Sequence, residues 1–309
     1  MVDLAGKLIV GTYGAYLILD PETGDYDIFK RHHQLYHWGI TWSDRFLVTC
    51  VWLGISTTFL FYDRNFKRIE TIKPPEHRSI IAPHQILWFD DKLWIANTQY
   101  DYANIYDFDN KSWEIWRMFN EKTYRGPEKR GGDIYHMNGV WFYDGHVFVC
   151  AHNKQRPSFI SIFEYPSLKY IETLDVGRMI HNIWCENGEF FTCSSGDGKI
   201  ITTTGKEVVR TGGFPRGVSI TDKYNCIGIS PHHFHGCKKR NEVDGEIQIY
   251  DKNWNLIRVF VTRGFGQVYE MRMFGKRDIT HWAGSENVKF NYPDLRRKPP
   301  ADCYRLSLD

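Results

Sequence analysis

Ionisable side chains recur at one position of a repeating pattern in this sequence. Six short motifs have as their central residues His37, His84, His136, His181, Arg216 and Glu270. These residues lie 47, 52, 45, 35 and 54 positions apart, which is typical of a repeat with one supersecondary unit per copy. Imidazoles at like positions of neighbouring units can converge, and their nitrogens bind first-row divalent transition metals. The pattern therefore predicts a metal site formed by His37, His84, His136 and His181.

The elements that position these residues are predicted to be short strands. Val, Ile, Thr, Tyr, Phe and Trp dominate the runs between turns, and aromatic residues make up 16% of the chain. In the clearest unit, residues 84–89, 92–97, 103–108 and 112–119 form four such runs separated by turns. Each unit is thus predicted to be a four-stranded antiparallel sheet whose first strand begins at the ionisable residue.

The two ends of the sequence are complementary. Residues 7–12, 15–20 and 25–30 form three strands without an inner partner, whereas the sixth inner strand, 268–274, has no outer strands after it. Pairing the two would close a ring and leave only short edges exposed. The arrangement resembles a six-bladed β-propeller, which implies an all-β fold in one domain spanning residues 1–309. Residues 276–309 are expected to pack outside it or to complete the first blade, where 278–283 could replace 7–12.

Composition narrows the class of protein. Basic residues exceed acidic residues by only 2 in 309, which gives no reason to expect binding to nucleic acid or to an anionic membrane. No stretch of 18 consecutive apolar residues occurs, and the N-terminal segment lacks the features of a signal peptide. Of seven cysteines, Cys50, Cys150, Cys193 and Cys226 fall at like places in the repeats. Buried, reduced thiols are predicted there, as expected for a cytoplasmic protein.

The first residue of an inner propeller strand lies at one mouth of the central channel, and the loops around that mouth are rich in basic residues. Their net charge is +7, whereas that of the whole chain is +2, so we expect a small anionic substrate or ligand there. Arg216 and Glu270 are the candidate catalytic residues, Glu270 as a base or as support for a histidine. The candidate substrate-binding residues are Arg216, Gln99, Tyr100, His152, Arg156, His233 and His235.

Three interpretations of the recurring histidines remain open. In the first, one divalent transition metal, with Fe or Mn favoured over Cu, Ni or Zn, serves an enzyme. The site is then similar to those of carotenoid-cleaving oxygenases, with four histidines on Fe(II), and of oligogalacturonate lyases, with three on Mn(II); both are seven-bladed. An oxidoreductase is slightly favoured over a lyase acting on uronate-type sugars. In the second, the propeller only binds an anionic ligand or a protein. In the third, the histidines are structural.

Overall fold

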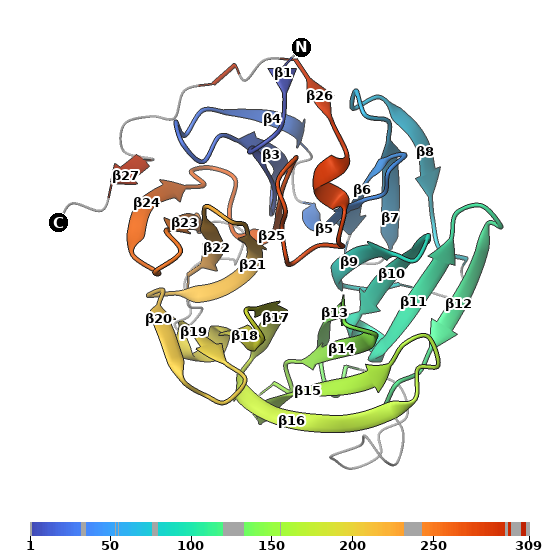
Figure 1. Cartoon of the computed structure of the whole chain (residues 1–309). Coiled ribbons are helices and arrows are strands. Elements are labelled where there is room, and N and C mark those ends of the chain that lie inside the picture. Colours follow the sequence, from blue (N-terminus) through green and yellow to red (C-terminus); the bar gives the residue numbers. More distant parts are fainter. Residues whose placement is uncertain are drawn as a thin grey trace.

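A computed structural model describes residues 2–31, 35–52, 54, 56–75, 80–119, 133–154, 156–231, 243–293, 296–297 and 304–306. Six four-stranded antiparallel sheets, the blades, surround a central axis (Figure 1). The predicted six-bladed β-propeller is therefore confirmed, and solved propeller structures compared below support it. No helix in the described ranges is long and apolar enough to cross a membrane.

The blades share one order, from an inner strand on the axis to an outer strand on the rim. From the first to the sixth blade, the inner strands are β25 (Val268–Met273), β5 (Tyr36–Trp42), β9 (Pro83–Phe89), β13 (Met137–Tyr143), β17 (Ile180–Glu186) and β21 (Phe214–Ile220). The second strands are β2 (Leu8–Thr12), β6 (Leu47–Trp52), β10 (Lys92–Asn97), β14 (His146–Ala151), β18 (Glu189–Ser194) and β22 (Asn225–Ser230). The third strands are β3 (Ala15–Leu19), β7 (Thr57–Tyr62), β11 (Tyr102–Asp107), β15 (Pro157–Glu164), β19 (Lys199–Thr202) and β23 (Glu246–Tyr250). The outer strands are β4 (Tyr26–Arg31), β8 (Arg68–Ile72), β12 (Ser112–Trp116), β16 (Tyr170–Arg178), β20 (Glu207–Arg210) and β24 (Leu256–Val261).

The first blade combines strands from both ends of the sequence. Strand β25 pairs with β2 in antiparallel register, with Leu8 opposite Met273 and Gly11 opposite Glu270. Every residue of both strands is buried. This pairing gives the N-terminal strands an inner neighbour on the axis.

A β-bulge interrupts the pairing near the start of every inner strand. Bulges bend a strand and redirect its side chains, so they decide which residues face the axis. In the second blade the residue paired before the bulge is His37, whereas in the third it is Pro83. Trp38, and not His37, therefore occupies the position that corresponds to His84.

The core consists mainly of apolar layers between adjacent blades, because each strand has one face toward each neighbouring blade. Four buried cysteines, Cys50, Cys150, Cys193 and Cys226, lie on the second strands of different blades and are not disulfide-bonded. Burial raises the pKa of each of these thiols. The prediction that these four thiols are buried is confirmed.

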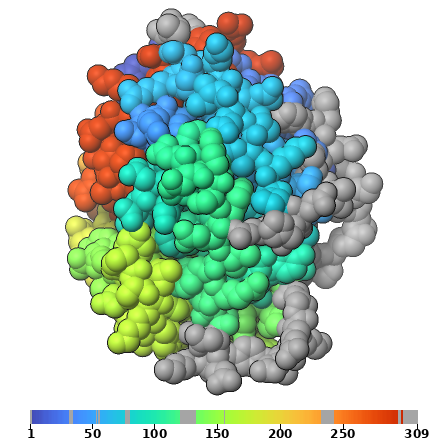
Figure 2. Space-filling view, turned by 90° about the vertical axis from the view of Figure 1, so that its right-hand side faces the viewer, coloured from blue at the N-terminus to red at the C-terminus, as the bar shows by residue number. Residues whose placement is uncertain are grey.

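The C-terminal tail crosses the face of the ring opposite the mouth where the inner strands begin. It carries a 3-10 helix, η5 (Ser285–Asn287), and a short strand, β26 (Asn291–Tyr292), which pairs with β1 (Val2–Asp3). In Figure 1 this part, in orange to red, faces the viewer, and in Figure 2 it lies on the left-hand side. Strand β27 (Tyr304–Leu306) extends the sixth blade beyond β24.

The tail does not complete the first blade, which corrects one of the two placements predicted for it. Residues 278–283 form no strand, and β2 holds the position beside β25 instead. Residues 278–283 instead pack across the channel, where they contact inner strands far away in the sequence.

Candidate functional site

Four imidazole rings lie together at the mouth where the inner strands begin. We call His84, His136, His152 and His181 the imidazole group. The ring centroids of His84 and His136 are 4.9 Å apart, and those of His136 and His152 are 4.7 Å apart. The distance is 5.6 Å from His152 to His181 and 6.2 Å from His181 back to His84. Three predicted metal ligands are thus joined by His152, which was predicted to bind substrate.

His84 is oriented by a hydroxyl group in the short helix η2 (Thr98–Tyr100) that follows β10. Its Nδ1 lies 2.6 Å from Thr98 Oγ1 and 3.1 Å from the carbonyl oxygen of Ala82. Because the Thr98 hydroxyl donates to the carbonyl of Met137 at 2.7 Å, it accepts from His84. The hydrogen of the neutral ring is therefore on Nδ1, and the lone pair is on Nε2.

His181, in the fifth blade, makes the same two kinds of contact as His84 does in the third blade. Its Nδ1 lies 2.9 Å from Ser195 Oγ in helix η3 (Ser195–Asp197) and 3.0 Å from the carbonyl oxygen of Met179. The Ser195 hydroxyl donates to the carbonyl of Pro215, so the His181 ring also carries its hydrogen on Nδ1. A carbonyl or hydroxyl that fixes the tautomer in this way is typical of histidines that ligate through Nε2.

His136 and His152 complete the group with two different orientations. His136 Nδ1 donates to Asp133 Oδ1 at 2.9 Å, which again leaves the lone pair on Nε2. His152 Nδ1 instead accepts from the backbone N–H of Lys154 at 3.1 Å. A neutral His152 therefore carries its hydrogen on Nε2, as a donor. Three rings of the group offer a lone pair on Nε2, and the fourth offers a hydrogen.

The charge state of His181 suits ligation. Burial lowers the pKa of its imidazole well below the ordinary value, and the nearby His152, Arg216 and His136 lower it further. His181 therefore stays neutral at neutral pH, as a metal ligand must.

His37, predicted as a fourth ligand, is not in the imidazole group. It is fully buried, and its ring packs edge-on against Tyr16, with centroids 4.8 Å apart. The bulge in β5 directs Trp38 to the axis instead, where its ring centroid is 4.2 Å from that of His84. The sequence pattern aligned His37 with His84, because Tyr36-His37-Trp38 reads like the other motifs.

Arg216 lies beside the group and is almost completely buried. Its Nε donates to the carbonyl of Val268 at 3.0 Å, and Nη2 donates to Gln267 Oε1 at 2.6 Å. The guanidinium carbon lies 4.3 Å from the ring centroid of Tyr269, within cation–π range. These contacts hold a desolvated positive charge next to His181.

Below the imidazole group the channel narrows to a cavity of about 10 Å³, which has room for about one water molecule. Its lining is formed by Trp38 and Tyr269 and by the polar side chains of His84, Gln85, Asn138, His181, Asn182, Arg216 and Glu270. The candidate base Glu270 thus lines this cavity and is not level with the imidazole group.

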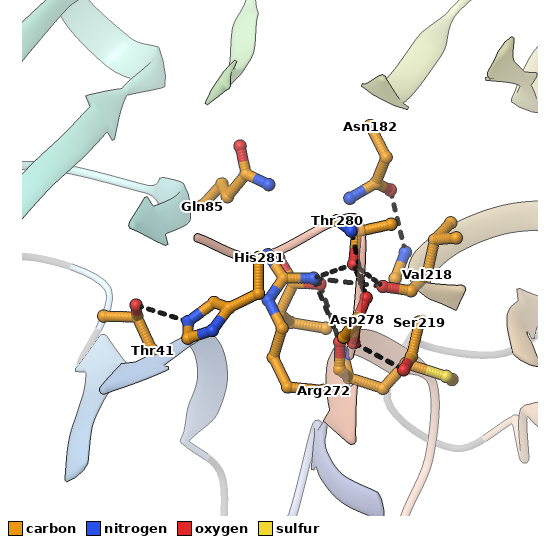
Figure 3. Close-up of polar contacts among 12 residues, drawn as sticks. Thr41, Gln85, Asn182, Val218, Ser219, Arg272, Asp278, Thr280 and His281 are labelled. Carbon is orange, nitrogen blue, oxygen red and sulfur yellow. Dashed lines mark hydrogen bonds and ion pairs between the residues drawn. The ribbon is translucent and has the colours of Figure 1, made fainter. Parts of the chain in front are cut away.

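Glu270 is tied to Arg272 rather than to a histidine. Arg272 Nη1 lies 3.0 Å from Glu270 Oε1, and both side chains are buried. The same guanidinium contacts the carbonyl of Val218 at 3.0 Å and the hydroxyl of Thr280 at 3.3 Å. Thr280 belongs to the C-terminal tail, so the tail and this ion pair meet in the channel (Figure 3).

The tail is anchored there by further polar contacts, two of which are visible in Figure 3. Asp278 Oδ2 accepts from the hydroxyl of Ser219 at 2.5 Å, and His281 Nε2 lies 2.8 Å from Thr41 Oγ1. Trp282 Nε1 donates to the carbonyl of Trp42 at 2.6 Å. These contacts close the channel on the face opposite the imidazole group.

Burial raises the pKa of the Glu270 carboxyl from 4.5 to about 7, although the Arg272 charge opposes this. The folded protein then binds a proton that the unfolded chain has released, so Glu270 makes wild-type stability fall as pH rises from about 5 to about 7. We expect Glu270→Gln, which cannot titrate, to gain stability relative to wild type over this range. Urea unfolding at pH 5, 6, 7 and 8 measures the difference. A constant difference between the two proteins would contradict the raised pKa.

The other predicted substrate-binding residues are not brought to the group. Gln99 and Tyr100 lie in η2, but Thr98 makes the contact with His84, and Tyr100 stacks on Tyr102. Arg156 is exposed. His233 and His235 lie outside the described residues, as do many residues of the loops that gave the mouth its predicted positive charge.

Sequence reasoning missed the hydroxyl groups that orient the rings. Thr98 and Ser195 each lie 14 positions after the histidine they contact. This shared spacing was a detectable signal, because each hydroxyl follows the second strand of its blade.

In the described part of the chain, no group of three or more His, Cys, Asp or Glu side chains is arranged so that it could hold a metal ion without rearrangement. A metal on the imidazole group therefore requires rotation of some of the rings. The ring of His136, whose side chain is 24% exposed, is placed where rotation is possible.

No protein-family model and no curated protein matches the sequence. Solved structures do match. A chain of the nidogen/laminin complex aligns over 86% of this chain and 97% of its own length, with 11% identity and a TM-score of 0.64. TolB from Acinetobacter baumannii aligns over 88% of this chain and 67% of its own, with 10% identity and a TM-score of 0.58. The β-propeller domain of Cps50 (Swd1) from Myceliophteria thermophila aligns over 87% of this chain and 83% of its own length, with 14% identity and a TM-score of 0.50. At such identities these likenesses show the fold alone, and that fold is a β-propeller.

Proposed function

We propose that this propeller is a metal-dependent enzyme whose divalent transition metal is held at the imidazole group. The observation that carries the proposal is the common orientation of His84, His136 and His181, each with its hydrogen on Nδ1 and its lone pair on Nε2. Structural histidines need only satisfy their own hydrogen bonds. Three rings with the same tautomer in neighbouring blades favour a shared ligand on the axis.

The spacing of the rings supports this proposal. A metal–nitrogen bond of about 2 Å places an imidazole centroid about 3 Å from the ion, so two ligating rings in a tetrahedral site lie roughly 5 Å apart. The distances of 4.9 Å from His84 to His136 and 6.2 Å from His84 to His181 are close to that value. Because no set of described side chains is arranged to hold an ion, the rings would have to rotate to bring their Nε2 atoms together.

The remaining groups have roles on the substrate side. His152 presents Nε2–H at the mouth and can donate to a substrate oxygen. Arg216, buried beside His181, can attract a carboxylate or phosphate group, and burial weakens the screening of its charge by salt. The substrate is accordingly a small anionic or polar organic molecule.

For the reaction we favour an oxidoreductase or oxygenase. Neutral imidazoles leave the charge of the ion uncompensated, which suits Fe or Mn as a redox centre or Lewis acid, while Cu, Ni and Zn also accept imidazole ligands. A lyase acting on uronate-type sugars would use the same metal and the same Arg216.

The proposal predicts metal uptake. Protein prepared without a histidine tag, stripped with a chelator and dialysed against Fe(II), Mn(II), Cu(II), Ni(II) or Zn(II) in turn should retain close to one equivalent of at least one metal. Uptake should fall at mildly acidic pH, because protonated imidazole cannot ligate. Elemental analysis measures both results. Only trace metal with all five ions would overturn the enzyme proposal.

The alternative function is a binding module for an anionic ligand or a protein, and the burial of Arg216 beside Tyr269 supports it. Metal-free wild type would then bind phosphate or a small carboxylate, and Arg216→Met would abolish that binding. In the enzyme proposal the anion binds tightly only after the metal is loaded. Titrating inorganic phosphate into metal-free and metal-loaded protein separates the two functions.

A further inference from the structure

Three side-chain amides form a layer directly below the imidazole group. Gln85 follows His84 in β9, Asn182 follows His181 in β17, and Asn138 lies at the bulge of β13 between them. All three line the cavity of about 10 Å³. In Figure 3 the amides of Gln85 and Asn182 point into the same space above Arg272.

Two of these amides use their oxygen to link neighbouring blades. Gln85 Oε1 accepts from the backbone N–H of Val140 at 3.0 Å, and Asn182 Oδ1 accepts from that of Gly217 at 3.1 Å. The NH2 groups are therefore what Gln85 and Asn182 present to the cavity.

Asn138 has the opposite orientation. Its Nδ2 donates to the carbonyl of Ile180 at 2.7 Å, so the oxygen remains for the cavity. Asn138 is 3% exposed, and its Oδ1 has no hydrogen-bond partner among the described residues. A buried acceptor without a partner is energetically costly, which is a reason to expect a bound donor.

The three amides thus offer two donors and one acceptor to a guest the size of a single water molecule, and Arg216 and Glu270 also line the cavity. An ordered buried water needs two to four polar partners, which this lining provides. A metal ion is a poor guest at this level, because two NH2 groups would direct partial positive charge at it. His136 and His152 do not line the cavity, so an ion shared by the imidazole group lies above it.

We propose that Gln85, Asn138 and Asn182 form a seat for one oxygen atom, a water or hydroxide, which would also ligate a metal held by the imidazole group. The seat rests on the cavity alone, whereas its role as a ligand rests on the proposed function. Two NH2 donors, with the positive charge of Arg216 in the same lining, favour the anionic form of the guest, and an ionised Glu270 carboxyl opposes it. Fluoride, a single-atom anion of the same charge, is then the matching probe.

The test uses isosteric changes that keep the links between blades. Asn182→Asp and Gln85→Glu retain the oxygen bonded to the next blade and replace the NH2 donor with a carboxylate oxygen. Fluoride affinity of the Zn(II)-loaded protein, measured by ¹⁹F NMR, should fall about ten-fold or more in each variant, since a hydrogen bond to a charged group is lost. Asn187→Asp is the control, because Asn187 has the same left-handed backbone as Asn182 (φ of 53° and 56°) but lies exposed at the turn after β17.

A second measurement keeps the seat testable without metal. A crystal structure of the metal-free protein should show one water within hydrogen-bond distance of Gln85 Nε2, Asn182 Nδ2 and Asn138 Oδ1. An empty cavity there, or fluoride affinity unchanged in both variants, would overturn the seat. Failure of wild type to take up any metal would overturn only the proposed function. The presence or absence of the water in the metal-free crystal structure would then decide whether the seat exists.

Discussion

We expect His181→Ala to lower the affinity for the bound metal by at least 10-fold to 100-fold, the range typical even of changes to groups that only orient a ligand. His84→Ala and His136→Ala should have effects of the same order, because all three rings present Nε2. Competition with a fluorescent chelator measures the affinity. The His84 and His136 variants should remain folded, since these two side chains are only partly buried, whereas His181 is buried and its variant should be checked by urea unfolding.

Two other histidines serve as controls. His146→Ala changes a histidine next to the turn at the other end of the fourth blade and should leave metal affinity unchanged. His37→Phe should lower stability through its packing against Tyr16 without reducing metal uptake. Equal loss of metal in His37→Phe and His181→Ala would contradict the assignment of the imidazole group.

We also expect Arg272→Met to destabilise the protein by about 3–5 kcal/mol at pH 8, the range for removal of one partner of a buried ion pair. The change leaves the Glu270 carboxyl in the channel without its counter-charge, and it removes hydrogen bonds to Val218 and Thr280. The pKa of Glu270, already about 7, should rise further, so the deficit should be smaller at pH 6 than at pH 8.

A double-mutant cycle separates the charge from the packing. Adding Glu270→Met to Arg272→Met removes the unpaired carboxyl, so the double variant should recover part of the lost stability in urea unfolding. Thr71→Ala on the outer strand β8 of the second blade is a control for substitutions away from the channel. Simple additivity of the two channel substitutions would show that Arg272 acts only through its contacts with the backbone and the tail.

The architecture was predictable because its signals are local. Strand 92–97 was predicted with the bounds that β10 has, since its apolar residues begin directly after the turn at Asp90 and Asp91. Which side chains face the axis could not be assigned from the sequence, because a bulge in each inner strand shifts the register by one residue. His37 and Trp38 are adjacent in the sequence, and only the pairing of β5 with β6 decides which of them faces the channel.

The remaining differences come from contacts between distant segments. His152 joins the imidazole group because β14 ends beside β17, which no spacing along the chain indicates. The position of the tail likewise depends on contacts of Asp278 and His281 with Ser219 and Thr41, up to 240 positions away. Local periodicity cannot report such contacts.

The closure of the ring has a mechanical consequence. Leu8 lies opposite Met273, so the N-terminal segment enters β2 at the same end of the pair at which the C-terminal tail leaves β25. A force that pulls the two termini apart would load the hydrogen bonds between these strands one after another, as in a zipper, and not all at once in shear. The tail bears the load first, because Val2 is itself paired with Tyr292. The first blade should therefore open at low force once β27, the pair of β1 and β26 and the channel contacts of the tail have separated.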